Sequence, residues 1–223
     1  MIVVIKMKEQ MKYDTNIYQL RGMVLNRMVE IMRNQLYAKE GGTVFFGDSL
    51  TEMCDLDQFY PELDNKYNCG ICGITSDMLL HFIDEGVIKY RPKQVVIMVG
   101  TNDLGDTTQS SPRDIALNIK EMCEIIHNNL PECRIFVCSM IPCLEKYHGY
   151  KMLKKGIRSN DMLKIVYKEI KNVIRYDYVS MINVYPTLCN KKGEPIENIY
   201  IDGLHINEQG YILLSNKIKE SIL

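Results

Sequence analysis

The sequence predicts one three-layer α/β/α domain, in which a five-stranded parallel sheet lies between two layers of helices. The first observation is the length of 223 residues, close to that of one large domain. The second is a composition of 46% apolar and 25% charged residues, which is typical of a globular protein with a core. The third is the alternation of short apolar runs with longer helical patterns, which indicates parallel βαβ units.

Short runs rich in β-branched and aromatic residues mark the expected strands. Four of them cover residues 43–46, 94–99, 134–138 and 178–184, and a weaker one covers 66–69. The run at 95–99, Val-Val-Ile-Met-Val, does not alternate between apolar and polar residues. We therefore expect a central strand there that is buried on both faces of the sheet.

Amphipathic patterns between these runs predict helices at about 75–85, 112–129, 159–174 and 207–222. Ser111 and Asn207 stand where N-caps are expected, and Pro112 suits a first helical turn. A further amphipathic helix is expected over roughly 13–39, ended by Gly41 and Gly42. We expect residues 1–42 to form an N-terminal extension and residues 43–222 to form a catalytic core.

Charge and hydropathy exclude several classes of function. The net charge is −1, from 27 basic and 28 acidic residues, so no nucleic-acid partner is expected. The longest apolar runs are far shorter than the roughly 18 residues of a membrane helix, so no membrane span is expected. The apolar stretch at the N-terminus is too short for the core of a signal peptide, which predicts a cytoplasmic protein.

The eight cysteines are expected to be reduced, because no secretion signal accompanies them. Cys69 and Cys72 have the Cys-x-x-Cys spacing of a metal or redox site. No second close pair of cysteines or histidines accompanies them, so we expect small packing residues and no metal.

Four polar turns marked by glycine stand next to expected strands or helices. The carboxyl ends of parallel strands meet at one edge of a sheet, so these turns are expected to converge. They are Gly47-Asp48-Ser49-Leu50, Asn68-Cys69-Gly70, Gly100-Thr101-Asn102-Asp103 and Asp202-Gly203-Leu204-His205. Each alone is ordinary turn chemistry, but together they supply every part of an acyl-transfer site.

The four blocks resemble those of the GDSL (SGNH) hydrolases, a family of serine esterases and lipases on a flavodoxin-like sheet. The resemblance covers residues 43–222 and is nearest to small acylhydrolases related to the platelet-activating-factor acetylhydrolase catalytic subunit. Cys69 departs from the pattern, because a bulkier or basic residue commonly precedes the glycine. The resemblance implies hydrolysis of short acyl esters, chiefly acetyl esters, of a small molecule or carbohydrate, without a cofactor. Whether the protein forms a homodimer is left open.

The chemistry of the residues gives each a role. Ser49 at a strand end is the expected nucleophile, and His205 is the expected base because imidazole titrates near neutrality. Asp202 can accept a hydrogen bond from the second ring nitrogen and fix the tautomer. The expected oxyanion donors are the backbone N–H groups of Ser49 and Gly70 and the Asn102 amide.

Three alternatives use the same sequence differently. An α/β-hydrolase is disfavoured, because its Gly-x-Ser-x-Gly elbow would need a glycine where Thr51 stands. A flavodoxin-like binding module would treat the four turns as scaffold. An acyltransferase would use the same residues with an alcohol in place of water.

The other three histidines are rivals for the base. His81 and His127 fall inside expected helices, where a surface or core role is the simpler interpretation. His148 lies in a loop with several basic residues, which we interpret as solvent-facing.

Overall fold

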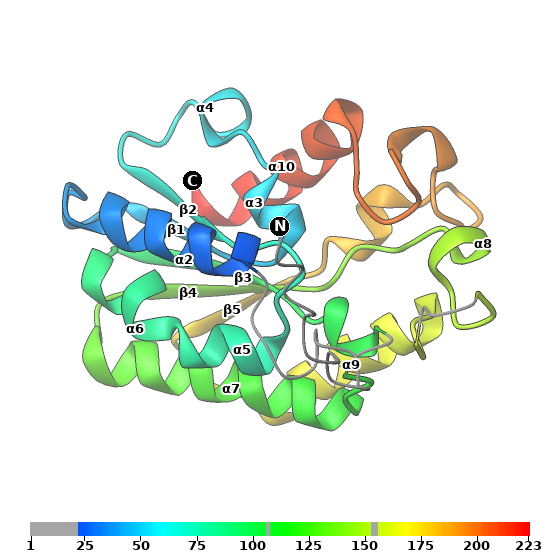
Figure 1. Cartoon of the computed structure of the whole chain (residues 1–223), viewed down its shortest axis with the longest axis horizontal. Helices are drawn as coiled ribbons and strands as arrows, with labels where there is room; N and C mark the ends of the chain where they lie inside the picture. The colour runs from blue at the N-terminus through cyan, green and yellow to red at the C-terminus, as the bar shows by residue number, and fades with distance from the viewer. Residues whose placement is uncertain (1–21, 106–107, 153–155) are drawn as a thin grey trace, which may run out of the picture.

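The computed structural model describes residues 22–105, 108–152 and 156–223. Five parallel strands form one sheet in the order β2-β1-β3-β4-β5, as Figure 1 shows. The strands are β1 (Thr43–Gly47), β2 (Lys66–Gly70), β3 (Gln94–Met98), β4 (Arg134–Cys138) and β5 (Val179–Ile182). All five lie where the apolar runs predict them, and the three-layer α/β/α fold is confirmed.

Helices cover both faces of the sheet (Figure 1). One face carries α2 (Gly22–Gln35), α5 (Ser76–His81), α6 (Ile83–Gly86), α7 (Pro112–Asn129) and α9 (Asn160–Val173). The other face carries α3 (Ser49–Glu52), α4 (Leu56–Phe59) and α10 (Glu208–Ile222). Short connections add α8 (Glu145–His148) and the 3-10 helices η1 (Ile88–Tyr90), η2 (Asn102–Leu104), η3 (Tyr185–Leu188) and η4 (Glu197–Ile199).

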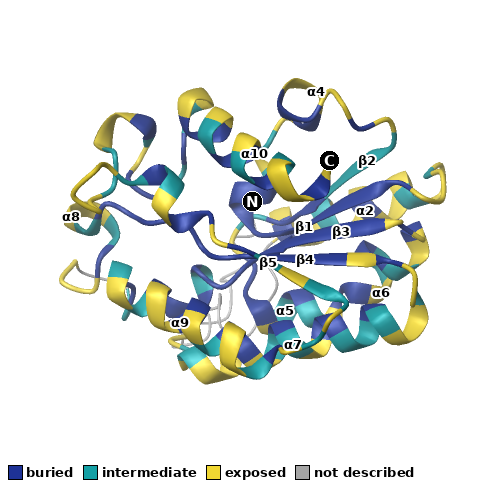
Figure 2. Ribbon diagram, turned by 180° about the vertical axis from the view of Figure 1, so that it is seen from behind, coloured by how far each residue is buried: buried dark blue, intermediate teal, exposed yellow. Residues whose placement is uncertain are grey.

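The central strands send alternate side chains into two separate apolar clusters. In β3, Val95 and Ile97 pack under α7 and its neighbours, whereas Val96 and Met98 pack under α10. All five residues of β3 are buried, as the unbroken apolar run predicts. Figure 2 shows the central strands β1, β3 and β4 as a largely dark, buried layer between helices whose outer faces are exposed, whereas the edge strands β2 and β5 are partly exposed.

Polar side chains start the two long helices as expected. Ser111 Oγ accepts a hydrogen bond from the Asp114 N–H at 3.1 Å, and Pro112 is the first residue of α7. Asn207 Oδ1 accepts one from the Gly210 N–H at 3.2 Å before α10. Both caps satisfy amides that the first helical turn leaves unpaired.

Two helix predictions need correction. The helix expected at 75–85 is two short helices, because the backbone leaves helical geometry at Phe82 (φ −101°, ψ 7°). The helix expected to run to about residue 39 ends at Gln35, and turns and irregular chain follow it before β1. Residues 13–21 of that prediction lie outside the described residues.

The strand order creates a switch point between β1 and β3, because the chain leaves β1 for β2 on one side and later returns on the other. Loops at the carboxyl ends of strands diverge at such a point, which is where open α/β sheets place their sites. In the described part of the chain, no helix is long and apolar enough to cross a membrane.

Candidate active site

The junction between β1 and α3 places Ser49 at the edge of the switch point. Gly47 ends β1 where any Cβ atom would clash with the Met98 carbonyl and the Thr51 hydroxyl. Asp48 then caps α3, its Oδ1 accepting a hydrogen bond from the Leu50 N–H at 3.0 Å. The sharp strand-to-helix turn therefore fixes Ser49, which is only 4% exposed, as the first residue of α3.

A tight hairpin before α10 brings His205 to this serine. The hairpin is closed by a bridge between Tyr200 and Ile206, and Gly203 takes a positive φ of 94° at its tip. His205 Nε2 lies 2.9 Å from Ser49 Oγ, across 156 residues of sequence. His205 Nδ1 lies 2.7 Å from Asp202 Oδ2, so the three predicted residues form one hydrogen-bonded chain.

Asp202 is held by more than the imidazole. Its Oδ1 accepts hydrogen bonds from the N–H groups of Leu204 at 2.9 Å and His205 at 2.8 Å. Partial burial pushes the pKa of Asp202 upward, but the bonds from the His205 ring and the two N–H groups outweigh it and lower the pKa to about 2. The ionised carboxylate favours a proton on Nδ1, which leaves Nε2 to accept the Ser49 hydroxyl proton.

Asn102 lies in the turn that follows β3, as the first residue of η2. Its Nδ2 donates to the Ile74 carbonyl at 3.0 Å, which ties it to the loop that follows β2. That loop is also tied to α3, because the Cys72 N–H donates to a Glu52 carboxylate oxygen. The loop thus lies between the helix that carries Ser49 and the turn that carries Asn102.

Both backbone groups of Gly70, the residue predicted as an oxyanion donor, have partners within the fold. Its N–H donates to Asn68 Oδ1 at 3.0 Å, and its carbonyl accepts from Arg27 Nε at 3.0 Å. A Cβ atom at this position would clash with the backbone of Thr51 and Glu52. Glycine is therefore needed here for close packing against α3, and the N–H that was predicted as an oxyanion donor is already bound to Asn68.

Gly73 is a second glycine in this block, and the sequence pattern did not single it out. It lies in the loop between the Cys72 and Ile74 contacts, with a positive φ of 75° and open space where a Cβ would be. A positive φ turns the peptide N–H away from the direction that ordinary strand geometry would give it. The available signal was a second glycine three residues after Gly70.

Asp48 lies beside Ser49 and is 1% exposed. Burial raises its pKa to about 7, and the Asp103 carboxylate acts in the same direction. The Leu50 N–H, the His205 ring and Arg158 oppose this rise. The site therefore contains a carboxyl group that changes charge close to neutral pH.

The other histidines are engaged away from the serine. His81 Nδ1 lies 2.8 Å from the Asp77 carbonyl on α5, and the His127 ring stacks on Tyr178 at 3.7 Å. His148 ends α8. Of the four histidines, His205 is the one with a hydrogen bond to Ser49 among the contacts of the described residues.

The Cys69 and Cys72 pair lies close to the site but differs in environment. Cys69 is fully buried in β2, whereas Cys72 is partly exposed in the loop beyond it. Burial raises the pKa of both thiols to about 12. Within residues 22–105, 108–152 and 156–223, no three or more histidine, cysteine or acidic side chains gather as metal ligands would.

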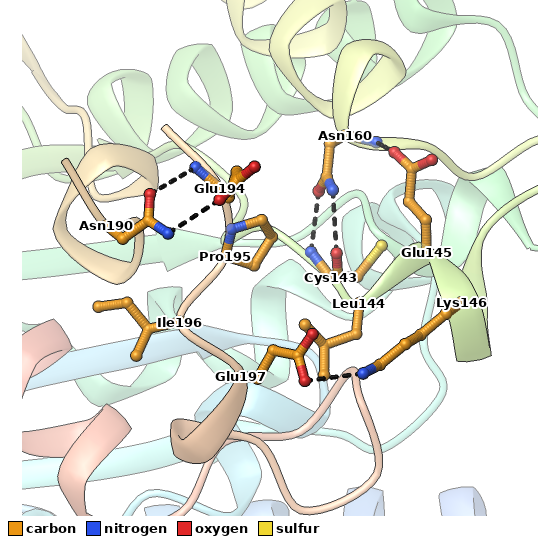
Figure 3. Close-up of a pocket in the computed structure, with 10 residues that line it drawn as sticks. All are labelled: Cys143, Leu144, Glu145, Lys146, Asn160, Asn190, Glu194, Pro195, Ile196 and Glu197. Atoms are coloured by element: carbon orange, nitrogen blue, oxygen red, sulfur yellow. Dashed lines mark hydrogen bonds and ion pairs between the residues drawn. The ribbon is translucent and has the colours of Figure 1, made fainter. Parts of the chain in front are cut away.

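A cleft of about 600 Å³ lies beside α8, between Asn160 and the loop at 190–197 (Figure 3). Most of its polar groups are already paired with one another. The Asn160 amide is bonded to both backbone groups of Cys143 at 2.9 Å, and Lys146 pairs with Glu197 at 2.7 Å. Because these groups bind each other, we interpret the cleft as structural and place the chemistry at Ser49.

Comparisons with known proteins agree with this geometry. Residues 45–213 match the GDSL-like Lipase/Acylhydrolase family. The chain is 24% identical over 189 residues to the platelet-activating factor acetylhydrolase IB subunit alpha2 of Rattus norvegicus, covering 83% of this chain and 77% of that protein.

Solved structures share the fold. A GDSL-like lipase from Bacteroides thetaiotaomicron superposes with a TM-score of 0.74 at 21% identity, covering 87% of this chain and 96% of that one. An acetyl esterase variant solved with an acetate ion gives a TM-score of 0.65 at 15% identity, covering 82% and 96%.

Proposed function

Because the chain belongs to the GDSL-like lipase/acylhydrolase family, we propose that it is a serine esterase that hydrolyses short-chain acyl esters through an acyl-enzyme on Ser49. The observation that carries the proposal is the hydrogen-bonded chain from Ser49 Oγ through His205 to Asp202. A nucleophile, a base and an orienting acid in series are the arrangement that activates a serine hydroxyl.

Acylation begins when Ser49 Oγ attacks the carbonyl carbon of the ester. The hydroxyl proton passes to His205 Nε2 over the 2.9 Å contact, and the imidazolium is stabilised by the Asp202 carboxylate. The tetrahedral intermediate then collapses. The bond to the alcohol oxygen breaks, Nε2 returns the proton to that oxygen, and the acyl group stays on Ser49.

The charge on the intermediate needs donors that are already in place. We assign this role to the Ser49 N–H, to the second hydrogen of Asn102 Nδ2, and to the Gly73 N–H in place of that of Gly70. The Ser49 N–H is at the first turn of α3, where helix amides are unpaired. Asn102 and Gly73 are held together through the loop contact at Ile74.

Deacylation uses the same groups in reverse order. His205 Nε2 takes a proton from water, and the hydroxide oxygen attacks the acyl carbon. The intermediate collapses with the proton passing to Ser49 Oγ, which releases the carboxylic acid and restores the enzyme. No step in this scheme requires a cofactor.

The preference for short acyl groups is supported by two similarities. The relative from Rattus norvegicus is called an acetylhydrolase, and one structure of the same fold is an acetyl esterase with acetate. We propose an acetyl ester of a small molecule or carbohydrate as the substrate.

A serine-directed fluorophosphonate and a set of 4-nitrophenyl esters from acetyl to decanoyl test the proposal. We expect labelling on Ser49, fastest turnover of the shortest esters, and loss of both in Ser49→Ala, which removes the attacking oxygen. His205→Ala should lower kcat by about a thousandfold or more. His127→Ala is the matched control and should retain activity, because His127 lies in α7 and its ring stacks on Tyr178. Full activity of Ser49→Ala would refute the proposal and favour a binding module.

A further inference from the structure

Arg158 is a buried arginine beside the candidate active site. It is 5% exposed and lies just before α9, where the N–H of its neighbour Ile157 donates to the Leu104 carbonyl at 2.9 Å. Its Nε donates to the Thr101 carbonyl at 3.0 Å. Thr101 immediately precedes Asn102, so the guanidinium is fastened to the turn that carries a proposed oxyanion donor.

The charge of Arg158 has no close counter-ion among the described residues. A guanidinium has five N–H donors, and only Nε has a hydrogen-bond partner there. By contrast, the partly buried Arg27 pairs with Glu30 at 2.9 Å, and the exposed Arg113 pairs with Glu169 at 3.2 Å. Burying a charge in this way is costly unless something pairs with it.

The unused donors of Arg158 are not sealed in the core. In the described structure neither Nη atom is both fully buried and without a partner. Because neither has a hydrogen-bond partner there, each keeps some solvent-accessible surface. The Thr101 hydroxyl beside it is among those unsatisfied atoms. One Nη lies close enough to Gly105 that a Cβ there would be 3.3 Å away.

The Asp48 carboxyl group acts on Arg158 electrostatically, but the two side chains do not form an ion pair in the described structure. The Asp48 carboxylate accepts its hydrogen bond from the Leu50 N–H, and no ion pair within 4.0 Å joins the two side chains in the described structure. If Arg158 served only to bind the Thr101 carbonyl, one donor would be enough, and the neutral amide of a glutamine could supply it. The charge and the two free Nη groups therefore remain to be explained.

We propose that Arg158 binds an anionic group, a carboxylate or phosphate, that the ester substrate carries in addition to its ester bond. The planar fork of a guanidinium matches the two oxygens of such a group, and a largely desolvated site strengthens the contact. Arg158 is then a specificity-determining residue of the esterase proposed above, on which this inference rests. The anionic group can belong to the acyl part or to the alcohol part of the ester.

The test compares the wild type with Arg158→Gln, Arg158→Lys and the exposed control Arg113→Gln. Three esters are used: 4-nitrophenyl acetate, which is neutral; mono-4-nitrophenyl succinate, with a carboxylate on the acyl side; and 4-acetoxybenzoate, with one on the alcohol side. Acetyl glycerol 3-phosphate tests a phosphate. The ratio of mutant to wild-type kcat/KM for each ester removes differences in intrinsic reactivity.

We expect Arg158→Gln to lower kcat/KM for at least one anionic ester by about thirtyfold or more, because a buried charged contact is lost. The neutral ester should lose at least tenfold less than that anionic ester, because it carries no group for the guanidinium to bind. The ester that responds identifies the side of the substrate that carries the charge. Arg158→Lys keeps the charge but not the fork and should fall between the two, and Arg113→Gln should match the wild type.

An equal loss for neutral and anionic esters in both Arg158 variants, with a lower melting temperature, would show a structural role and overturn the inference. If Arg158→Gln had the wild-type kcat/KM for every ester, the inference would also be overturned. Calorimetric binding of succinate to Ser49→Ala, compared with Ser49→Ala/Arg158→Gln, gives a readout without turnover. Binding that is lost with Arg158 supports the inference even if no ester is hydrolysed, in which case it is the esterase proposal that fails.

Discussion

The Asn102 side chain can be tested for a catalytic role apart from a helix-capping role. The N-cap of η2 is Thr101, and no side chain caps that helix, so Asn102 is not there as a cap. One of its amide hydrogens is bound to the Ile74 carbonyl, and the second is the one that we propose donates to the oxyanion. The side chain is thus oriented before any substrate arrives.

Asn102→Ala should lower kcat by about a hundred- to thousandfold with little change in KM, because the donor acts on charge that develops during the reaction. Asn102→Asp should be at least as harmful, since a carboxylate would repel both the oxyanion and the Ile74 carbonyl. Steady-state kinetics of both variants, with melting temperatures, check this. An active Asn102→Asp enzyme would remove Asn102 from the catalytic set.

Asp48 makes the stability of the fold depend on pH. Its pKa rises from an ordinary 3.8 to about 7 because of burial, so the folded state holds its proton more tightly than the unfolded state does. Stability is therefore lost as the pH rises from about 4 to about 7, by up to roughly 4 kcal/mol at higher pH. Below pH 4 the effect vanishes, because both states are protonated.

Asp48→Asn should remove this dependence. The amide oxygen can still accept the bond from Leu50, so the cap of α3 remains. We expect the variant to gain stability over the wild type as the pH is raised from 4 to 8, measured by urea unfolding at each pH. Asp64→Asn, at an exposed aspartate, is the control and should follow the wild type. A constant difference between Asp48→Asn and the wild type across this range would contradict the assignment.

At the scale of the elements, local sequence predicted most of the structure. The β4 run at 134–138 and the helix at 112–129 have the predicted bounds, because a continuous apolar run and a Ser-Pro cap each define an end chemically. The break at Phe82 was not predictable, since the pattern of apolar residues continues through it and no glycine or proline marks it.

The loop after β2 shows what sequence could not decide. Gly70 was predicted as part of a polar turn, and Gly73 follows it three residues later. A glycine can serve close packing or a positive φ, and the sequence alone does not distinguish the two. Only the approach of α3 to Gly70, and the φ of 75° at Gly73, separate the two functions.

Alanine at these two positions should therefore have different costs. Gly70→Ala places a Cβ against the backbone of α3, which cannot yield easily, so we expect a loss of about 2 kcal/mol or more in unfolding free energy. Gly73→Ala meets open space and only the strain of its positive φ, about 1 kcal/mol. Urea unfolding of both variants measures the difference. Equal costs would contradict the packing role of Gly70.

At the scale of the whole molecule, the strand order assembles the site. Ser49 follows β1, Asn102 follows β3 and Gly73 follows β2, which are the three neighbouring strands at the switch point. His205 lies near the end of the sequence and follows none of these three strands. The hairpin at 200–206 places it next to Ser49. This contact could be expected from the resemblance of the four blocks, but not from the pattern of strands.

The accessibility of the cysteine thiols reflects how tightly the two helix layers pack on the sheet. All eight are free thiols, and five of them are buried: Cys69, Cys123, Cys133, Cys138 and Cys143. Burial raises the pKa of Cys69, Cys123 and Cys138 to about 12, and the thiolate is the form that reacts with disulfide reagents. Reaction of these thiols therefore requires the layers to separate.

Ellman's reagent at pH 8 should accordingly titrate at most the three partly exposed thiols of the native protein, those of Cys54, Cys72 and Cys189. Of these, Cys54 and Cys72 should react slowly, because burial raises the pKa of each to about 12. In guanidinium chloride, protein prepared without oxidant should release eight equivalents, and mass spectrometry of alkylated peptides identifies the sites. Fewer than eight equivalents would reveal a disulfide. Fast native labelling of Cys123 or Cys138 would show that the helix layers open readily over the sheet.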